Sequence, residues 1–377
     1  MSSHTLEGIR VLDLSRLLPG PFATQILANM GAEVIKVERP PEGDYLRALP
    51  PWAEPPEGEG GEGIGAIFAS INRGKKSIVV DFSSPRGRDT VLRLAATADV
   101  FVESFLPGAL ERRGLGYQPV HKANPRLIYC SLSGYGQNGP YRHRPGHDVN
   151  YLALAGILGL NAAPGGPPHL LPVQISDLAG GMAAAVAILA GLVGRERTGQ
   201  GEYLDVALFD AAVDWMEPSV GSLFRAEKRK PTPGGMTLTG RYPCYQVYET
   251  ADGHYMSLGA LEGNFWKGFC ELIERHDLLG RQFDPTAVPE VAAIFCGKTR
   301  AEWTELAGRT AICLEPVLDV EETFALPQVA ARGRAQPDAG RLPSMGEDTI
   351  AVLEAAGFGQ DELDEMIQAG TIAVSRG

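Results

Sequence analysis

Cysteine, positive charge and long runs of large apolar residues are all scarce in this sequence of 377 residues. The five cysteines are odd in number, scattered and never paired as CxxC, so neither a disulfide framework nor a zinc site is indicated. We expect no metal, and a reducing cytoplasm fits this cysteine usage best. The first residues lack the basic and apolar blocks of a signal peptide, so export is not expected.

The formal net charge of −12 argues against two classes of partner. Nucleic acids and anionic membranes both require a basic surface on the protein. The most apolar segment, residues 178–194, is largely alanine and glycine and is shorter than the roughly 20 residues of a membrane span. We therefore expect a buried helix there, no nucleic-acid or membrane partner, and a local basic cluster wherever an anionic ligand binds.

Strand and helix patterns alternate through the first half of the chain. The predicted buried strands are 8–14, 33–37, 77–80, 100–103, 127–132 and 203–208. The predicted helices are 19–30, 85–96, 149–160 and 175–192. This alternation predicts an α/β fold with an open parallel sheet and helices on both of its faces. Residues 40–65, rich in proline, glutamate and glycine, are expected to form a long surface loop of the kind that often serves as a lid.

The second half of the chain has a different pattern. A basic, proline-containing stretch at 227–233 breaks the composition and is interpreted as a linker. Two strand patterns at 245–249 and 255–258 flank Ala-Asp-Gly, which is typical of an antiparallel hairpin. Helical patterns dominate afterwards and end with 349–356 and 362–369. The length and this change of pattern favour two domains over one.

One histidine and three acidic residues are the candidates for chemistry. His147 and Asp148 stand side by side at the entry to an apolar segment, Asp177 opens the next such segment, and Glu262 lies alone among small apolar residues. Such groups can perform proton transfer, because burial and charged neighbours tune a base toward neutral pH. Plainer roles are open: a surface histidine, a helix cap at Asp148, and a first-turn acid at Asp177. The glycine pair after Asp177 indicates a close approach to the backbone.

Basic residues form a second group. Arg39 follows a predicted strand, and Arg73, Lys75 and Lys76 surround a glycine before the next strand. Ligands of open α/β sheets bind at the carboxyl ends of the strands, so Arg39 is placed to meet a phosphate, and the other three could bind further phosphate oxygens. A solvated charged turn is an equally good interpretation. The absence of a P-loop and of a GxGxxG fingerprint argues against a nucleotide hydrolase or a dehydrogenase.

The order of these motifs resembles the family III CoA-transferase superfamily of the CaiB/BaiF type. The resemblance covers most of the chain and is carried by residues 8–15, 31–40, 72–77, 133–140 and 245–262. Within the superfamily, the Gly-His-Asp-Val-Asn-Tyr stretch at 146–151 looks like the α-methylacyl-CoA racemases. Transferases of the family usually lack this histidine and use the aspartate that matches Asp177 as a nucleophile.

The resemblance implies a role for each candidate. His147 and Asp177 would be the two catalytic bases, and Glu262 would hold the imidazole. Coenzyme A, as part of the substrate and with no prosthetic group, would lie along the residues Arg39, Asn72, Arg73, Lys75, Lys76 and Tyr151. Removing and returning a proton on opposite faces of one carbon needs two such groups. Backbone amides after Asp177 are candidates to stabilise the intervening enolate.

The resemblance also implies the assembly, an interlocked homodimer in which Glu262 meets the His147 of the partner chain. A large Rossmann-like domain with the open parallel sheet would comprise residues 1–200, followed by a linker at 201–233. A smaller α+β domain would cover 234–325. Residues 326–377 would return to the large domain and complete it with the C-terminal helices.

Two departures from the family pattern matter. Leu106 stands where the family commonly has an arginine before Pro-Gly that the racemases use toward a CoA phosphate, and Arg112 and Arg113 are candidates to replace it. The stretch between Arg334 and Pro343 is also shorter than usual. Three hypotheses follow: a racemase of 2-methyl-branched acyl-CoA esters, a CoA transferase with Asp177 as covalent nucleophile, and a non-catalytic CoA-binding homologue.

Overall fold

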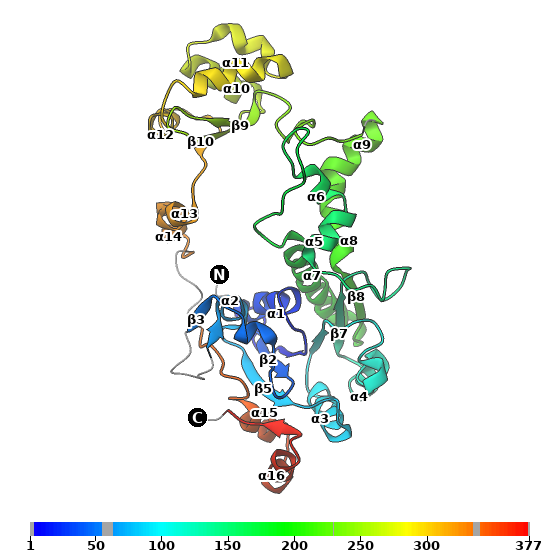
Figure 1. Ribbon diagram of the computed structural model, residues 1–377. Helices are drawn as coiled ribbons and strands as arrows, with labels where there is room; N and C mark the ends of the chain where they lie inside the picture. Colours follow the sequence, from blue (N-terminus) through cyan, green and yellow to red (C-terminus); the bar gives the residue numbers. More distant parts are fainter. Residues whose placement is uncertain (1–3, 55–62, 229, 335–339, 376–377) are drawn as a thin grey trace. The chain divides into compact units, whose positions relative to one another are not determined.

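The computed structural model describes residues 4–54, 63–228, 230–334 and 340–375, and they form two compact units (Figure 1). The large unit contains residues 1–157, 171–219 and 338–377, and the small unit contains 158–170 and 220–337. Both ends of the chain therefore belong to the large unit. The linker expected at 201–233 does not match this division, because the large unit continues to Ser219.

The large unit is built on a seven-stranded sheet with the order β12-β5-β2-β1-β6-β7-β8. Its strands are β1 (Arg10–Asp13), β2 (Glu33–Glu38), β5 (Lys76–Val80), β6 (Val100–Glu103), β7 (Ile128–Ser133), β8 (Tyr203–Ala207) and β12 (Ile372–Ala373). All neighbouring strands are parallel except β12, which pairs antiparallel with β5. The expected α/β fold with an open parallel sheet is confirmed.

Alternation along the strands divides the core between the two faces of this sheet. Leu12 and Ile35 pack on one face, together with α3 (Pro85–Ala95), α4 (Tyr117–Ala123), α15 (Thr349–Ala355) and α16 (Gln360–Gln368). Val11 and Val34 pack on the other face, together with α1 (Pro19–Asn29), α5 (Asp148–Leu154), α7 (Ile175–Thr198) and α8 (Leu208–Met216). Helices thus cover both faces, as the sequence predicts.

The long helix α7 crosses the large unit against α1, α8 and β7. By length and composition alone it could cross a membrane, although 44% of its apolar window is already buried inside the protein. Its glycine pair explains the packing. A Cβ on Gly180 would lie 2.3 Å from Leu208, and one on Gly181 would lie 2.7 Å from the carbonyl oxygen of Pro19. The close approach that the glycines indicate is therefore to neighbouring helices.

Two sequence predictions need correction. Residues 149–160 form two short helices, α5 and α6 (Ile157–Leu160), because Gly156 between them has a φ of 81°. The segment 40–65 is not only surface: it contains the 3-10 helix η1 (Tyr45–Ala48), the strands β3 (Trp52–Glu54) and β4 (Ile64–Gly65), and is followed by α2 (Ala66–Asn72). Leu46 is buried against Phe68 of α2. Residues 55–62 of the segment lie outside the described residues.

The small unit combines an antiparallel sheet with helices. Its strands, in the order β11-β10-β9, are β9 (Tyr245–Glu249), β10 (Tyr255–Gly259) and β11 (Leu314–Pro316), and the predicted hairpin is β9 and β10. Its helices are α9 (Ser222–Glu227), α10 (Gly263–Leu272), α11 (Val288–Phe295), α12 (Arg300–Ala307), α13 (Val320–Ala325) and α14 (Pro327–Ala331). Trp266 and Trp303 are fully buried in its core, and each indole donates a hydrogen bond to a backbone carbonyl.

Candidate active site

His147 is held by its own helix. It is the N-cap residue of α5, and its backbone amide donates a hydrogen bond of 3.0 Å to the Asn150 side chain. The Tyr151 hydroxyl donates to the carbonyl of Gly146 at 2.7 Å, which fixes the backbone just before the histidine. The His147 side chain itself is exposed. The chain therefore presents an imidazole on a rigid backbone.

Asp148 connects this histidine to the second candidate base. Its Oδ1 accepts hydrogen bonds from the backbone amides of Ser176 at 2.7 Å and of Asp177 at 3.3 Å. Those amides belong to the first turn of α7 and have no partner within the helix. The structural role expected for Asp148 is thus a cap, but on α7 rather than on its own helix. The contact brings the His147 backbone and the start of α7 together.

The Asp177 carboxyl lies in a half-buried position in the first turn of α7. Burial, and to a smaller extent the charge of Asp148, raises the pKa of Asp177 to about 7. Burial also raises the pKa of Asp148, against the opposing effect of its two amide hydrogen bonds. A carboxyl with a pKa near neutrality can both accept and return a proton at physiological pH.

The amides expected to stabilise an enolate are engaged elsewhere. Oδ1 of Asp148 accepts hydrogen bonds from the amides of Ser176 and Asp177. The amide of Leu178 donates to the carbonyl of Gln174 at 3.0 Å. The first turn of α7 therefore offers no free amide around Asp177 up to Leu178 in this structure. This finding corrects the expectation that backbone groups directly after Asp177 form an oxyanion site.

Glu262 belongs to the small unit, where it precedes α10 as the N-cap residue and is exposed. Its backbone carbonyl accepts hydrogen bonds from the amides of Phe265 and Trp266. Its contact with the His147 of a partner chain stays a prediction.

Of the predicted CoA-binding residues, Arg39 and Arg73 form no ion pair with any residue that the structure describes. Arg39 follows β2, is exposed, and lies over the ring of Phe82 at 5.7 Å. Arg73, which is half-buried, donates from Nη1 to the carbonyl of Gly340 at 3.3 Å, and its Nε is buried with no partner among the described residues. Leu106, where the resemblance leads us to expect an arginine, is 56% exposed. Arg113 donates to the carbonyl of Ala109, within its own turn.

Asn72 and Lys75 face the interior instead. The Lys75 ammonium donates to the carbonyl of Pro21 (2.8 Å), the hydroxyl of Thr24 (2.8 Å) and Oδ1 of Asn72 (2.9 Å), which uses all three of its donors. Asn72 is fully buried. Burial lowers the pKa of Lys75, and the carboxylate of Asp13 at 3.5 Å opposes that shift. In this structure neither residue has a group free for a phosphate.

Lys76 and Tyr151 are also engaged within the protein. Lys76 forms an ion pair with Glu33, which also accepts a hydrogen bond from Arg10 at 2.7 Å. Tyr151 is buried against Tyr135 with ring centroids 5.1 Å apart, and its hydroxyl donates a hydrogen bond to the carbonyl of Gly146. Tyr151 therefore positions the histidine loop, and CoA binding by Lys76 and Tyr151 stays a prediction.

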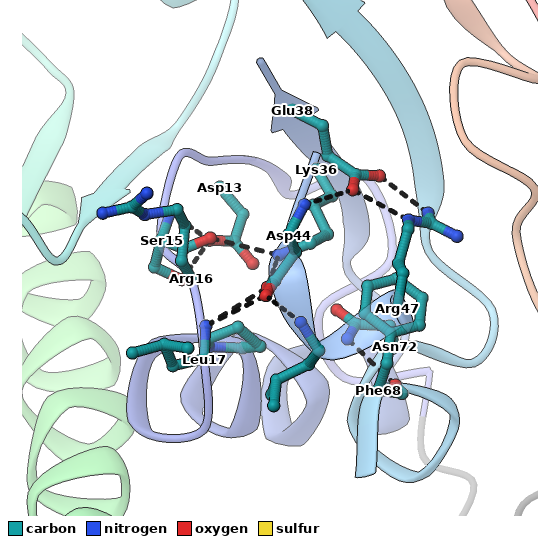
Figure 2. A network of polar contacts seen from close by, with 12 residues as sticks. Asp13, Ser15, Arg16, Leu17, Lys36, Glu38, Asp44, Arg47, Phe68 and Asn72 are labelled. Atoms are coloured by element: carbon teal, nitrogen blue, oxygen red, sulfur yellow. Dashed lines mark hydrogen bonds and ion pairs between the residues drawn. The ribbon is translucent and has the colours of Figure 1, made fainter. Parts of the chain in front are cut away.

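Sequence reasoning missed a buried ionic network beside the carboxyl ends of β1 and β2 (Figure 2). Lys36 pairs with Asp44 at 3.0 Å, and Arg47 pairs with Glu38 at 2.7 Å. A signal was present, because Lys36 lies inside the predicted buried strand 33–37 and Glu38 follows it directly. Charges in such a position must be paired. Their partners, from the segment predicted as a surface loop, could not be identified from the sequence.

The described residues contain no group of three or more His, Cys, Asp or Glu side chains that could hold a metal ion. That the protein needs no metal stays a prediction.

Comparison with known proteins decides the family. The sequence model of CoA-transferase family III matches residues 6–344. The chain belongs to CoA-transferase family III. This family III protein is 36% identical over 343 residues to the succinyl-CoA:glutarate CoA-transferase of Mus musculus, covering 88% of this chain and 76% of the relative. It is 32% identical over 402 residues to the α-methylacyl-CoA racemase of Homo sapiens, covering 98% and 99%.

The fold of this family III enzyme is shared with a solved CaiB/BaiF family protein from Brucella suis. The TM-score is 0.81 at 30% identity, and the match covers 94% of this chain and 100% of that protein. The relatives include both racemases and CoA-transferases. Membership in the family therefore does not by itself distinguish an isomerase from a transferase, and the residues of the site must be considered.

Proposed function

We propose that this enzyme is an α-methylacyl-CoA racemase, which epimerises 2-methyl-branched acyl-CoA thioesters. One observation carries the proposal: Asp148, the neighbour of His147, accepts hydrogen bonds from the amides of Ser176 and Asp177. This contact ties the residue next to His147 to the first turn of α7, which carries Asp177. The similarity to the human racemase over nearly the whole length of both chains supports the same conclusion.

The reaction needs one base and one conjugate acid on opposite faces of the α-carbon. In one direction Asp177 removes the α-proton and the protonated imidazole of His147 returns a proton to the other face. In the reverse direction the two groups exchange roles. A pKa of about 7 for Asp177 suits both roles, because the protonated and ionised forms are both populated near neutral pH. The enolate between the two steps requires donors other than the amides in the first turn of α7.

We infer that the CoA moiety is bound chiefly through Arg39, which is exposed, and Arg73, which is half-buried, because no ion pair to either guanidinium is found among the described residues. Arginine binds phosphate oxygens in a bidentate manner. No prosthetic group takes part in the proposed reaction, and coenzyme A enters only as part of the substrate. We expect the enzyme to work in the cytoplasm.

We also infer the interlocked homodimer, with Glu262 of one chain supporting His147 of the other. Support comes from an apolar stripe on α7, formed by Met182, Val186 and Val193, which are 47%, 65% and 66% exposed. Their spacing of four and seven residues places them on one side of the helix. A stripe of this kind on a long central helix is suited to contact with a second copy.

A CoA transferase is the second candidate, favoured by the 36% identity to the succinyl-CoA:glutarate CoA-transferase. In that reaction Asp177 would attack the thioester as a carboxylate nucleophile and His147 would be dispensable. The raised pKa of Asp177 works against this role, because it lowers the ionised fraction at neutral pH. The third hypothesis, a non-catalytic CoA-binding homologue, gives no reason for the Asp148 link between two proton-transfer groups.

One experiment separates the first two functions. The enzyme is incubated with a single epimer of 2-methyldecanoyl-CoA, with and without added succinate, and hydroxylamine is used to trap any activated carboxyl on Asp177. A racemase gives the other epimer without succinate and leaves Asp177 unmodified. Transfer of CoA to succinate, together with a hydroxamate at Asp177, would establish the transferase instead.

A further inference from the structure

Leu17 has an unusual backbone conformation at the carboxyl end of β1. Its φ is 66°, in the left-handed region that a branched side chain rarely adopts. Such residues persist only where surrounding contacts hold them, and they cluster at functional sites. In parallel α/β sheets, ligands bind at this end of the strands. The residue just before Leu17 is Arg16, which is exposed.

A single buried ion pair holds the backbone on both sides of Arg16 (Figure 2). Nζ of Lys36 donates to the carbonyl of Ser15 at 3.0 Å. The Asp44 carboxylate accepts from the amide of Leu17 at 3.2 Å. Lys36 and Asp44 pair with each other at 3.0 Å, and both side chains are 1% exposed. The buried Lys36–Asp44 pair therefore holds the backbone of the residues immediately before and after Arg16.

The Lys36–Asp44 pair is itself held in place, and its lysine is charged. The amide of Asp44 donates to Glu38 at 3.0 Å, and Glu38 is bound by Arg47. Burial alone would lower the pKa of Lys36, but the carboxylates of Asp44, Asp13 and Glu38 outweigh it and keep the pKa above its ordinary value. The ammonium therefore stays protonated at neutral pH.

Arg16 makes one further backbone contact, and its guanidinium contacts an aromatic ring. Its amide donates to Oγ of Ser104 at 3.1 Å, and its guanidinium lies over the ring of Phe105 at 5.2 Å. No ion pair to this guanidinium is found in the part of the chain that the structure describes. The Phe105 ring contacts Phe82 edge to face at 6.0 Å, and Arg39 lies over Phe82. The two exposed arginines thus cover two touching rings at the same end of the sheet.

We propose that Arg16 binds a phosphate group of the acyl-CoA, and that Asp44, paired with Lys36, is a positioning residue that holds Arg16 for it. The inference rests on the proposed function, because it takes CoA as the phosphate-bearing part of the substrate. Asp44 makes no contact with the ligand and acts through the amide of Leu17.

The test measures the dissociation constant of CoA by calorimetry, for the full-length protein and its variants. Arg16→Gln is expected to weaken binding about tenfold, the loss of one charge-assisted contact. Asp44→Asn keeps an acceptor oxygen but removes the charge that pairs with buried Lys36, and this is expected to loosen the backbone around Arg16 and weaken binding by a similar factor. The matched control is Arg126→Gln, an exposed arginine before the amino end of β7 with the same change of charge, which should leave the constant within twofold.

The double variant distinguishes positioning from a general structural role. If Asp44 acts through Arg16, Asp44→Asn combined with Arg16→Gln weakens binding only about tenfold, because the second change removes nothing further. Independent effects would multiply to about a hundredfold and overturn the inference. Leu17→Gly in the Asp44→Asn background should restore binding to within about threefold, since glycine adopts a positive φ without strain.

A milder variant covers the case in which Asp44→Asn does not fold. Ser104→Ala removes the further backbone contact of Arg16 at a half-buried position, and should weaken binding about threefold in the wild type and not at all in Arg16→Gln. Unchanged CoA binding by Arg16→Gln would overturn this inference alone. A wild-type protein that does not bind CoA would overturn the proposed function and this inference together.

Discussion

The carboxylate of Asp148 accepts a hydrogen bond from the backbone amide of Asp177 at 3.3 Å, so the acid next to His147 caps the helix that carries the second proposed base. The two residues are far apart in sequence. Asp148 also places a negative charge near the Asp177 carboxyl and helps to raise its pKa. One side chain thereby positions the two proposed bases and tunes one of them.

Replacing Asp148 by asparagine should shift the pH dependence of the reaction. Asparagine keeps an acceptor oxygen for α7 but removes the charge that raises the pKa of Asp177. The pKa of Asp177 should therefore fall. For the epimer whose proton Asp177 removes, the acidic limb of kcat/KM, expected near pH 7 in the wild type, should move to lower pH. An unmoved or upward-shifted limb would contradict this role of Asp148.

Glu103 should make stability depend on pH. It is buried at the end of β6, where its carboxylate accepts hydrogen bonds from Ser131 and from the amide of Phe105, and burial raises its pKa to about 7. The folded protein binds this proton more tightly than the unfolded chain. Stability from this group is therefore fully present below the ordinary glutamate pKa and is lost as pH rises through about 7.

Urea unfolding of Glu103→Gln at pH 4 and pH 8 checks this expectation. The variant should be about 3 kcal/mol more stable than the wild type at pH 8, and close to the wild type at pH 4. Glu354→Gln, at an exposed site on α15, is the control and should show no such difference. An equal effect of Glu103→Gln at both pH values would exclude the buried charge as the cause.

Two glycines of α7 should respond oppositely to alanine. A Cβ on Gly181 would lie 2.7 Å from the backbone oxygen of Pro19, so Gly181→Ala should destabilise the protein by about 1–3 kcal/mol. A Cβ on Gly194 would meet no atom within 4 Å, so Gly194→Ala should stabilise it by about 0.5–1 kcal/mol through helix propensity. Thermal unfolding measures both, and stabilisation by Gly181→Ala would refute the packing of α7 on α1.

The exposed stripe of α7 should be an interface between two copies. Val186→Glu places a charge in its middle and should convert a dimer to a monomer, as measured by light scattering after size exclusion. Ile367→Glu on α16, also an exposed apolar residue, is the control and should leave the mass unchanged. A wild-type protein that is monomeric at micromolar concentration would rule out the proposed dimer.

Local patterns predicted the sheet well, because strands such as β6 and β7 are short apolar runs bounded by turns, and because alternating helices imply parallel pairing. The segment 40–65 was predicted poorly. Its prolines and glycines are typical of loops, so the short helix and strands could not be recognised. Leu46 and Arg47 become buried only through contacts with other parts of the chain.

The candidate site was likewise predicted only in part from the sequence. The sequence points to His147 and Asp177, but the hydrogen bonds that Asp148 accepts from the first turn of α7 span 28 and 29 residues and cannot be read from local pattern. Lys75 is a lysine in a glycine turn, which is typical of a solvated position. Its burial depends on acceptors supplied by Pro21 and Thr24, some fifty residues earlier.

The central claim is two-base proton transfer by His147 and Asp177, and deuterium wash-in tests it most directly. The enzyme is incubated in D₂O with a single epimer of a 2-methylacyl-CoA and without any acceptor acid, while α-deuteration and the epimer ratio are followed together. We predict deuteration with formation of the other epimer in the wild type, and loss of epimerisation in both His147→Ala and Asp177→Ala. An absence of exchange in a wild-type enzyme that binds CoA, or full epimerisation by His147→Ala, would contradict the claim.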